Sequence, residues 1–136
     1  MVTSLDKIST EGGDVMHAMK KSSLGFKAYG EAYFSSIQYN NVKAWKKHNR
    51  MTLNLVVPSG SVRFVFALNP IENIFRVEEI GENRYFRLTV PPGIWFGFQG
   101  LSSGNSLILN IADIEHDPSE VLKKPSSAFS FDWSKL

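Results

Sequence analysis

Short runs of aliphatic, aromatic and β-branched residues recur along this chain with turn-forming residues between them, and this pattern constrains the fold more than any other feature. It predicts an all-β protein, because alternating side chains suit half-buried strands and Gly, Pro, Asn and Ser suit the turns that join them. The runs that we expect to form strands are 29–37, 51–57, 62–68, 73–80, 84–90, 95–100, 106–112 and 129–133.

Alternation within these runs indicates which side chains point inward. Phe86, Leu88 and Val90 share one face of their run, and the residues between them share the other face. Phe64 and Phe66 likewise share one face of the run 62–68. Strands that are apolar on one side and mixed on the other fit a closed barrel or a two-sheet jelly roll better than an open meander.

The stretch 90–98, Val-Pro-Pro-Gly-Ile-Trp-Phe-Gly-Phe, predicts a strand, a sharp corner and a second strand. The two prolines fix the backbone, Gly93 permits a tight reversal, and Gly97 allows two strands to approach closely. Three of the last four residues are aromatic, which is unusual for an exposed loop. We therefore expect this stretch to line either a core or a partly dry pocket.

The clearest helix signal covers 117–124. Asp117 is a suitable N-cap, Pro118 suits the first helical position, Glu120 suits the third, and Pro125 would end the helix. We expect one or two turns there. The segment 15–21 is compatible with a second short turn, a loop or an edge strand.

Composition limits the functional classes. With 136 residues the chain fits one domain, and without cysteine it has no thiolate nucleophile and no cysteine zinc site. The formal net charge is only +2, but the segment 43–50 holds four formal positive charges and no acid. Such a patch suits a small anion such as a ligand phosphate, so we expect no nucleic-acid partner. The segment 1–10 has no long apolar run, so we expect no membrane span and a cytoplasmic location.

The order of motifs resembles the dTDP-4-dehydrorhamnose 3,5-epimerase family, a branch of the cupins. The motifs are Gly-Asp at 13–14, Gly-Glu-Ala-Tyr-Phe-Ser at 30–35, Lys-Ala-Trp-Lys-Lys-His at 43–48, Leu-Val-Val-Pro-Ser-Gly at 55–60, the corner at 90–98 and Phe-Asp-Trp at 131–133. The resemblance implies a single cupin domain over 1–136, with a jelly-roll β-barrel at 29–133. It also implies a homodimer in which the N-terminal segment 1–28 extends onto the partner subunit.

The same resemblance implies a chemistry. The substrate would be a dTDP-linked 4-keto-6-deoxy sugar of surface-polysaccharide biosynthesis. An epimerase or ketoisomerase of this kind removes a proton beside the ketone and returns it, and it uses no cofactor. A base of suitable pKa and donors for the enolate oxygen suffice for this reaction.

The sequence departs from the family where the chemistry takes place. Lys46 occupies the position of the family's catalytic histidine, and Phe96 replaces a second histidine in the corner. By spacing, Ser126 falls where an aspartate would pair with the base. The scaffold is thus retained while the usual base is missing.

Lys46 and His48 are the candidate catalytic residues. They are two positions apart, so in an extended strand both project to one face, with Trp45 on the other. A desolvated Lys46 or a neutral His48 could act as the base, while Lys43 or Arg50 binds a pyrophosphate. The alternative is a solvated basic edge that discourages aggregation of strands.

Other candidate residues would bind substrate. Trp45 and Trp95 suit the face of a sugar ring or a thymine base, and the alternative for both is core packing. Polar groups for sugar hydroxyls would come from four further residues, Glu31, Tyr33, Asn110 and Asp113. Glu31 and Tyr33 could instead pair across the sheet.

We expect no metal. A cupin metal site needs a His-X-His pair followed by an acid and a later histidine, whereas this chain has Lys-Lys-His at 46–48 and three histidines in total. His116 could be a surrogate acid, but it lies just before the expected helix and suits a surface position. One other functional class stays open, a cupin that binds a carbohydrate or a nucleotide sugar without transforming it. A third class, a metal-dependent oxygenase, would need metal retained after purification, which the ligand count leads us not to expect.

Overall fold

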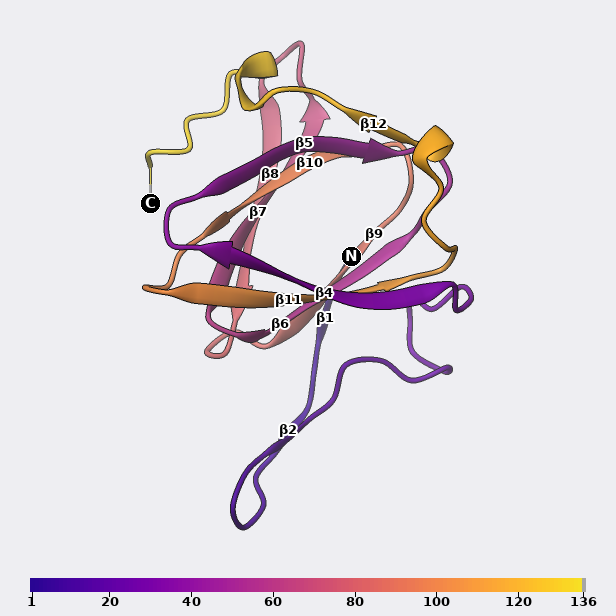
Figure 1. Cartoon of the computed structure of the whole chain (residues 1–136), viewed down its shortest axis with the longest axis vertical. Helices are drawn as coiled ribbons and strands as arrows, with labels where there is room; N and C mark the ends of the chain where they lie inside the picture. Colours follow the sequence, from indigo (N-terminus) through magenta and orange to yellow (C-terminus); the bar gives the residue numbers. More distant parts are fainter. Residues whose placement is uncertain (136) are drawn as a thin grey trace.

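The computed structural model describes residues 1–135 and contains two five-stranded antiparallel sheets that face each other (Figure 1). The strand order in the first sheet is β1 (Val2–Ser4), β9 (Phe86–Val90), β6 (Leu53–Ser59), β11 (Asn105–Ala112) and β4 (Glu31–Gln38). In the second it is β12 (Val121–Lys123), β5 (Val42–His48), β10 (Trp95–Gly100), β7 (Ser61–Asn69) and β8 (Ile74–Gly81). The all-β prediction is confirmed, and the architecture is the cupin jelly roll.

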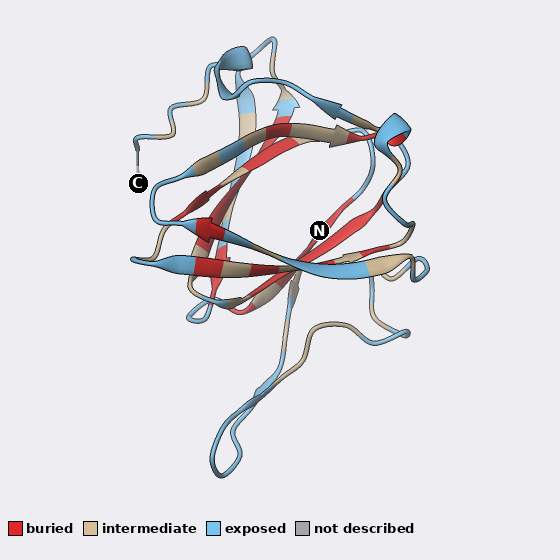
Figure 2. Ribbon diagram, viewed as in Figure 1, coloured by how far each residue is buried: buried red, intermediate tan, exposed pale blue. Residues whose placement is uncertain are grey.

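The main core lies between the two sheets, where their inward faces are buried (Figure 2). The predicted alternation is confirmed: Phe64 and Phe66 of β7 and Leu88 and Val90 of β9 belong to this core. Val65, between the two phenylalanines, belongs instead to a second cluster on the outer face of the second sheet. The β7 strand is therefore covered on both faces.

The C-terminal segment covers that outer face. After η2 (Ser126–Ala128), the side chains of Phe129, Phe131 and Trp133 pack on Trp45 and Phe75. The expected strand over 129–133 is wrong, since this segment has no strand. Its aromatic rings lie across the face of the sheet, and the neighbouring edge is already occupied by β12.

The helix expected over 117–124 is largely wrong. Asp117 does act as an N-cap, with its side chain accepting the Ser119 N–H, but only the single 3₁₀ turn η1 (Pro118–Glu120) follows. The chain then continues as β12, antiparallel to β5, with Lys123 opposite Lys46. The exposed edge of β5 provides backbone partners that local helix signals cannot reveal. The strand β5 itself was absent from the runs picked out by hydrophobic alternation.

The corner between β9 and β10 has the predicted geometry. Gly93 has φ = +90°, and its N–H donates to the carbonyl of His48 at 2.7 Å. Gly97 lies where the β10–β5 register shifts, and a Cβ there would be 2.4 Å from the Cβ of Ala44. Gly93 is thus required by its positive φ, and Gly97 is required by the close approach of β10 to β5. The hydrogen bond from Gly93 fixes the end of β5 at His48.

Gly97→Ala is expected to lower the free energy of unfolding by about 1–3 kcal/mol, because the added methyl overlaps a neighbouring strand. Chemical denaturation measures the loss. The double variant Gly97→Ala/Ala44→Gly removes the 2.4 Å overlap and should be less destabilised than the sum of the two single changes. Strict additivity would show that the contact between these strands does not matter.

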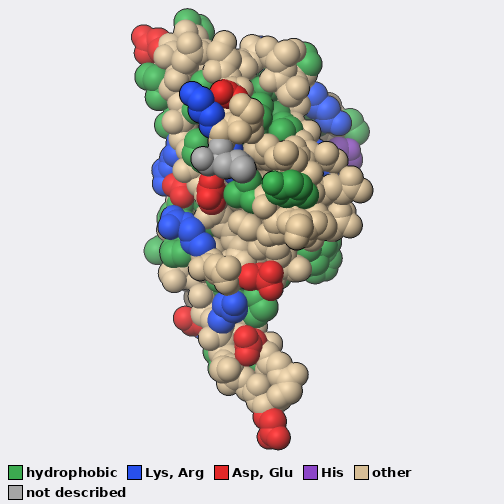
Figure 3. Space-filling model, turned by 90° about the vertical axis from the view of Figure 1, so that its left-hand side faces the viewer, with side chains coloured by type: hydrophobic (Ala, Val, Ile, Leu, Met, Phe, Trp, Pro, Cys, Tyr) green, Lys and Arg blue, Asp and Glu red, His purple; other side chains and the backbone are tan. Residues whose placement is uncertain are grey.

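The N-terminal segment has two parts. β1 pairs with β9 of its own sheet, whereas β2 (Lys7–Ile8) and β3 (Val15–Met16) form a hairpin that projects from the body (Figure 1). Figure 3 shows this extension from the side, with charged side chains of both signs along it. Its docking onto a partner subunit stays a prediction. Among residues 1–135, no helix is long and apolar enough to cross a membrane.

Candidate active site

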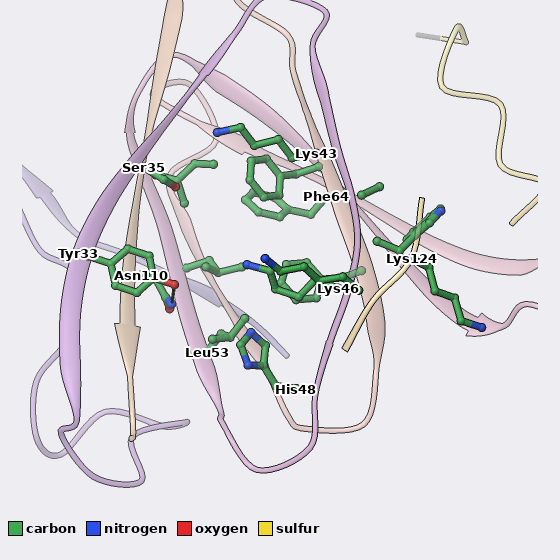
Figure 4. A pocket seen from close by; sticks show the side chains of 16 residues that line it. Tyr33, Ser35, Lys43, Lys46, His48, Leu53, Phe64, Asn110 and Lys124 are labelled. Atoms are coloured by element: carbon green, nitrogen blue, oxygen red, sulfur yellow. Dashed lines mark hydrogen bonds between the residues drawn. The ribbon is translucent and has the colours of Figure 1, made fainter. Parts of the chain in front are cut away.

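A cavity of about 390 Å³ opens between the two sheets (Figure 4). Its interior is largely apolar, with walls formed by Leu53, Leu55, Phe64, Phe96, Phe98 and Ile108. These side chains come from β6, β7, β10 and β11, and they are the inward faces of the jelly roll. The corner residue Phe96 is therefore both core and cavity wall.

One wall of the cavity is strongly basic. Lys43 and Lys46 come from β5, and Lys123 is the last residue of the paired strand β12. Lys124 follows β12, with its ammonium over the rings of Trp95 and Phe129 on the outer face of the sheet. The Lys43 ammonium donates to the Ser36 carbonyl at 2.9 Å. Lys43, Lys46 and Lys123 around one opening favour an anionic ligand group.

His48 forms a buried pair with Glu120. Its Nδ1 lies 2.5 Å from Oε1 of Glu120, and both side chains are almost fully buried. The other carboxylate oxygen, Oε2, accepts the backbone N–H groups of Asn49, Arg50 and Met51 at 3.1–3.3 Å. This network fixes the imidazole, and with Nδ1–H donating to the carboxylate, Nε2 keeps the lone pair.

Glu120 has an electrostatic environment that favours its ionised form. Burial alone would raise the pKa of this carboxyl, but the hydrogen bonds from His48 and from the Arg50 and Met51 amides outweigh burial and hold the pKa below its usual value. An ionised carboxylate at this point stabilises an imidazolium at His48. The pair therefore has the form of a general base with its orienting acid.

Glu120 is the site residue that the sequence did not reveal. The spacing placed Ser126 at the acid's position, and the helix pattern assigned Glu120 to a cap. In the structure the Ser126 carbonyl accepts the Trp45 indole N–H at 3.2 Å, outside the histidine pair. The available sequence signal for Glu120 was its position directly before Val121 and Leu122, two residues that suit a short strand.

Lys46 lines the cavity beside His48, so the predicted shared face of β5 is confirmed. Burial is the main cause that lowers the pKa of the Lys46 ammonium, followed by repulsion from Lys123 and Lys43, while Glu120 acts in the opposite direction. A lysine in such a place has an increased share of the neutral amine.

Asn110 and Tyr33 form the polar part of the opposite wall (Figure 4). The Asn110 Nδ2 donates to the Tyr33 hydroxyl at 2.9 Å, whereas the buried Oδ1 has no hydrogen-bond partner within the described residues. An unpartnered acceptor in a cavity wall suits a ligand hydroxyl. The Tyr33 hydroxyl accepts one hydrogen bond and keeps its own hydrogen for donation.

Three polar candidates lie elsewhere. Arg50 forms an exposed ion pair with Asp117 at 2.6 Å. The Asp113 carboxylate accepts the Thr52 N–H at 2.8 Å and serves the backbone at the end of β11. Glu31 begins β4 and is not part of the cavity wall. For Arg50 and Asp113, a role at a ligand would need a rearrangement that these present partners oppose.

The two tryptophans have their rings outside the cavity. Trp45 contributes to the wall, but its indole is 1% exposed among Phe129, Trp133 and Phe75. Trp95 packs edge-on against Phe129, with the Lys124 ammonium 5.1 Å from its ring centre. Alternation along β5 and β10 directs both rings to the outer face. The core-packing alternative therefore describes Trp45.

The remaining titratable groups do not form a metal site. Within residues 1–135, no three His, Cys, Asp or Glu side chains come together in a way that could hold a metal ion. His116 is exposed and lies outside the cavity.

No protein-family model and no curated protein matches the sequence. Among solved structures, a dTDP sugar isomerase from Desulfovibrio desulfuricans G20 has a TM-score of 0.91 and 31% identity, covering 100% of this chain and 91% of that one. A sugar 3,4-ketoisomerase from Thermoanaerobacterium thermosaccharolyticum, in complex with TDP, has a TM-score of 0.76 and 14% identity, and the match covers 91% of this chain and 87% of that one. The dTDP-4-dehydrorhamnose 3,5-epimerase from Elizabethkingia anophelis NUHP1 also has a TM-score of 0.76, with 15% identity, and the match covers 99% of this chain and 81% of that one.

The similarity to the ketoisomerase and the epimerase shows a shared fold. The similarity to the dTDP sugar isomerase extends over the whole chain and shows membership of the same family. The motif order read from the sequence points to the same group of proteins. The chain therefore belongs to the cupin family of dTDP-sugar isomerases and dTDP-4-dehydrorhamnose 3,5-epimerase-like proteins.

Proposed function

We propose that this protein is an epimerase or ketoisomerase of a dTDP-linked 4-keto-6-deoxy sugar, acting by proton abstraction and return without a cofactor. The observation that carries the proposal is the buried His48–Glu120 pair, which lies beside Lys46 in a cavity with a basic rim. A variant of the 3,4-ketoisomerase from Thermoanaerobacterium thermosaccharolyticum, which has a similar fold, has been solved in complex with TDP-4-keto-6-deoxyglucose, and this supports the substrate class.

His48 acts as the base in this proposal. Its Nε2 removes the proton from the carbon next to the ketone, and Glu120 stabilises the imidazolium that results. Lys46, on the same face of β5, stabilises the electrons that move onto the ketone oxygen. Return of the proton to the same carbon from the opposite side gives an epimer, and return to the former carbonyl carbon moves the ketone.

The opposite wall provides a second proton donor. The Tyr33 hydroxyl is held by Asn110 at 2.9 Å across the cavity from β5. It can donate its hydrogen to the face of the sugar that His48 does not reach. Lys43 and Lys123 at the rim bind the pyrophosphate, and the apolar walls enclose the sugar. A homodimer in the cytoplasm and a role in deoxysugar biosynthesis belong to the same proposal.

Solvent exchange tests the reaction. The protein is incubated with dTDP-4-keto-6-deoxyglucose in heavy water, and proton NMR follows the positions next to the ketone. We expect deuterium to enter one of these positions at a rate proportional to enzyme concentration. If no 4-keto sugar nucleotide exchanges, the catalytic proposal is overturned.

A binding protein without catalysis is the second candidate. Phe96 makes one cavity wall apolar at the position of the second histidine that the family has in the corner, which favours this alternative. Calorimetry separates the two candidates: nucleotide-sugar binding without exchange supports the binding protein. Exchange at saturating substrate excludes it.

Asn110→Leu is expected to weaken binding of the nucleotide sugar roughly 5- to 150-fold, because a buried acceptor for a sugar hydroxyl is lost. Calorimetry with the sugar nucleotide measures the change. Binding of dTDP alone should be unaltered, since it lacks the sugar. Equal losses for both ligands would mean that Asn110 shapes the cavity without binding the sugar.

A further inference from the structure

Lys46 reaches into the cavity from β5, and its nearest strand neighbours are an aromatic ring and a second lysine (Figure 4). The aromatic ring of Phe96 comes from the neighbouring strand, with its backbone opposite that of Lys46. On the other side of β5, Lys123 of β12 is opposite Lys46. Within residues 1–135, no Asp or Glu forms an ion pair with Lys46.

These surroundings favour the neutral amine. Burial first, and then the charges of Lys123 and Lys43, lower the pKa of Lys46, and the buried Glu120 only partly opposes them. A lysine that is desolvated or placed beside another cation is the usual form of an amine nucleophile toward carbonyl carbon. The proposed substrate brings a ketone to this cavity.

We propose that Lys46 forms a Schiff base with the ketone of the sugar, and that the resulting iminium is the electron sink for proton abstraction by His48. The inference rests on the proposed function and specifies its chemistry. It assigns Lys46 a covalent role, which differs from that of a hydrogen-bond donor to an enolate oxygen.

The steps balance without an oxidant or reductant. The Nζ lone pair attacks the carbonyl carbon, the C=O pair moves to oxygen, and proton transfer gives a carbinolamine. This intermediate takes one proton from solvent and loses water to form the iminium. His48 then removes the neighbouring C–H proton, and the C–H electrons form an enamine as the C=N pair moves to nitrogen. Reprotonation, addition of water and loss of one proton release the amine and the ketone.

The covalent route restricts the product. If the proton returned to the carbon bearing nitrogen, Lys46 would remain attached through a C–N single bond that water cannot hydrolyse. If it returns to the neighbouring carbon, the iminium is restored and hydrolysis frees the sugar. A Schiff base at Lys46 therefore requires epimerisation next to the ketone and excludes migration of the ketone. Tyr33, on the opposite wall, is placed to supply the proton from the other face.

Reductive trapping tests the proposal. The protein is treated with dTDP-4-keto-6-deoxyglucose and sodium cyanoborohydride at neutral pH, and intact-mass and peptide analyses follow. We expect a gain equal to the mass of the substrate less one oxygen atom, located on Lys46 and suppressed by excess dTDP. Lys46→Arg keeps the positive charge and should lose this adduct, whereas Lys124→Met should keep it.

The neighbouring charge gives a second readout. Lys123→Met removes one of the cations that lower the pKa of Lys46, so the pH dependence of trapping should move to higher pH. The other charged or titratable groups around Lys46 (Lys43, His48, Glu120, Lys124 and Tyr33) are unchanged in this variant. Thermal melting confirms that each variant is folded.

The outcomes distinguish the two proposals. Deuterium exchange by the wild type without an adduct on Lys46 overturns the Schiff base and leaves the proposed function intact. Migration of the ketone as the product overturns it as well. Absence of both exchange and adduct with bound substrate overturns both proposals. An adduct on Lys46 that dTDP suppresses, together with exchange, supports both.

Discussion

Replacing His48 by asparagine is expected to lower the rate of deuterium incorporation from heavy water by about 10²- to 10⁴-fold. The imidazole combines a basic nitrogen at the cavity with a buried carboxylate partner, 2.5 Å from its other nitrogen. Asparagine is similar in size and can still donate to Glu120, but it cannot accept a proton. Exchange is followed by NMR at saturating substrate.

The control for this variant is His116→Asn. His116 is exposed and lies outside the cavity, so its loss should leave the exchange rate unchanged. Calorimetry with dTDP should give similar affinities for both variants and the wild type, because the proposed pyrophosphate site consists of lysines. If His48→Asn exchanges deuterium at the wild-type rate, another group is the base.

The second large effect concerns stability. Glu120→Ala is expected to lower the free energy of unfolding by about 3–5 kcal/mol, because the buried carboxylate that accepts several N–H groups is removed. The three backbone N–H groups at 49–51 and the imidazole N–H of His48 would then lose their acceptor. Denaturation in urea measures the loss.

Glu115→Ala is the matched control, since Glu115 is an exposed acid five residues earlier in the chain. It should leave the unfolding free energy nearly unchanged. A small effect of Glu120→Ala, similar to that of Glu115→Ala, would contradict the network described for the carboxylate. Exchange activity should fall with Glu120→Gln even where the protein remains folded, because His48 loses its orienting carboxylate.

The stability that Glu120 contributes should depend on pH. Its pKa in the folded protein is below the usual value of about 4.3, so the unfolded chain takes up its proton at a higher pH than the folded one. The contribution is therefore complete above that usual value and is lost as the pH falls through the folded-state pKa. Melting temperatures of the wild type and Glu120→Gln should converge in this acidic range. A constant difference would contradict the assignment.

The sequence by itself determined the barrel and part of the site. Apolar alternation in β7 and β9 identified the faces that meet in the core, because each strand alone defines which side chains share a face. The glycines of the corner marked positions that require a particular backbone, and the structure has φ = +90° at Gly93. The two-residue spacing of Lys46 and His48 likewise placed both side chains on one wall of the cavity.

Only the tertiary structure determined which groups meet across the chain. Glu120 is 72 positions from His48, and its role depends on β12 pairing with the edge of β5, where local signals indicated a helix. The Trp45 ring is covered by aromatic residues of the C-terminal segment, which no local pattern directs to that face. Spacing and propensity describe neighbours in sequence, whereas the partner of a buried charge is selected by the whole packed barrel. For this reason the sequence indicated a cavity with a lysine and a histidine, and the fold supplied the acid that orients the base.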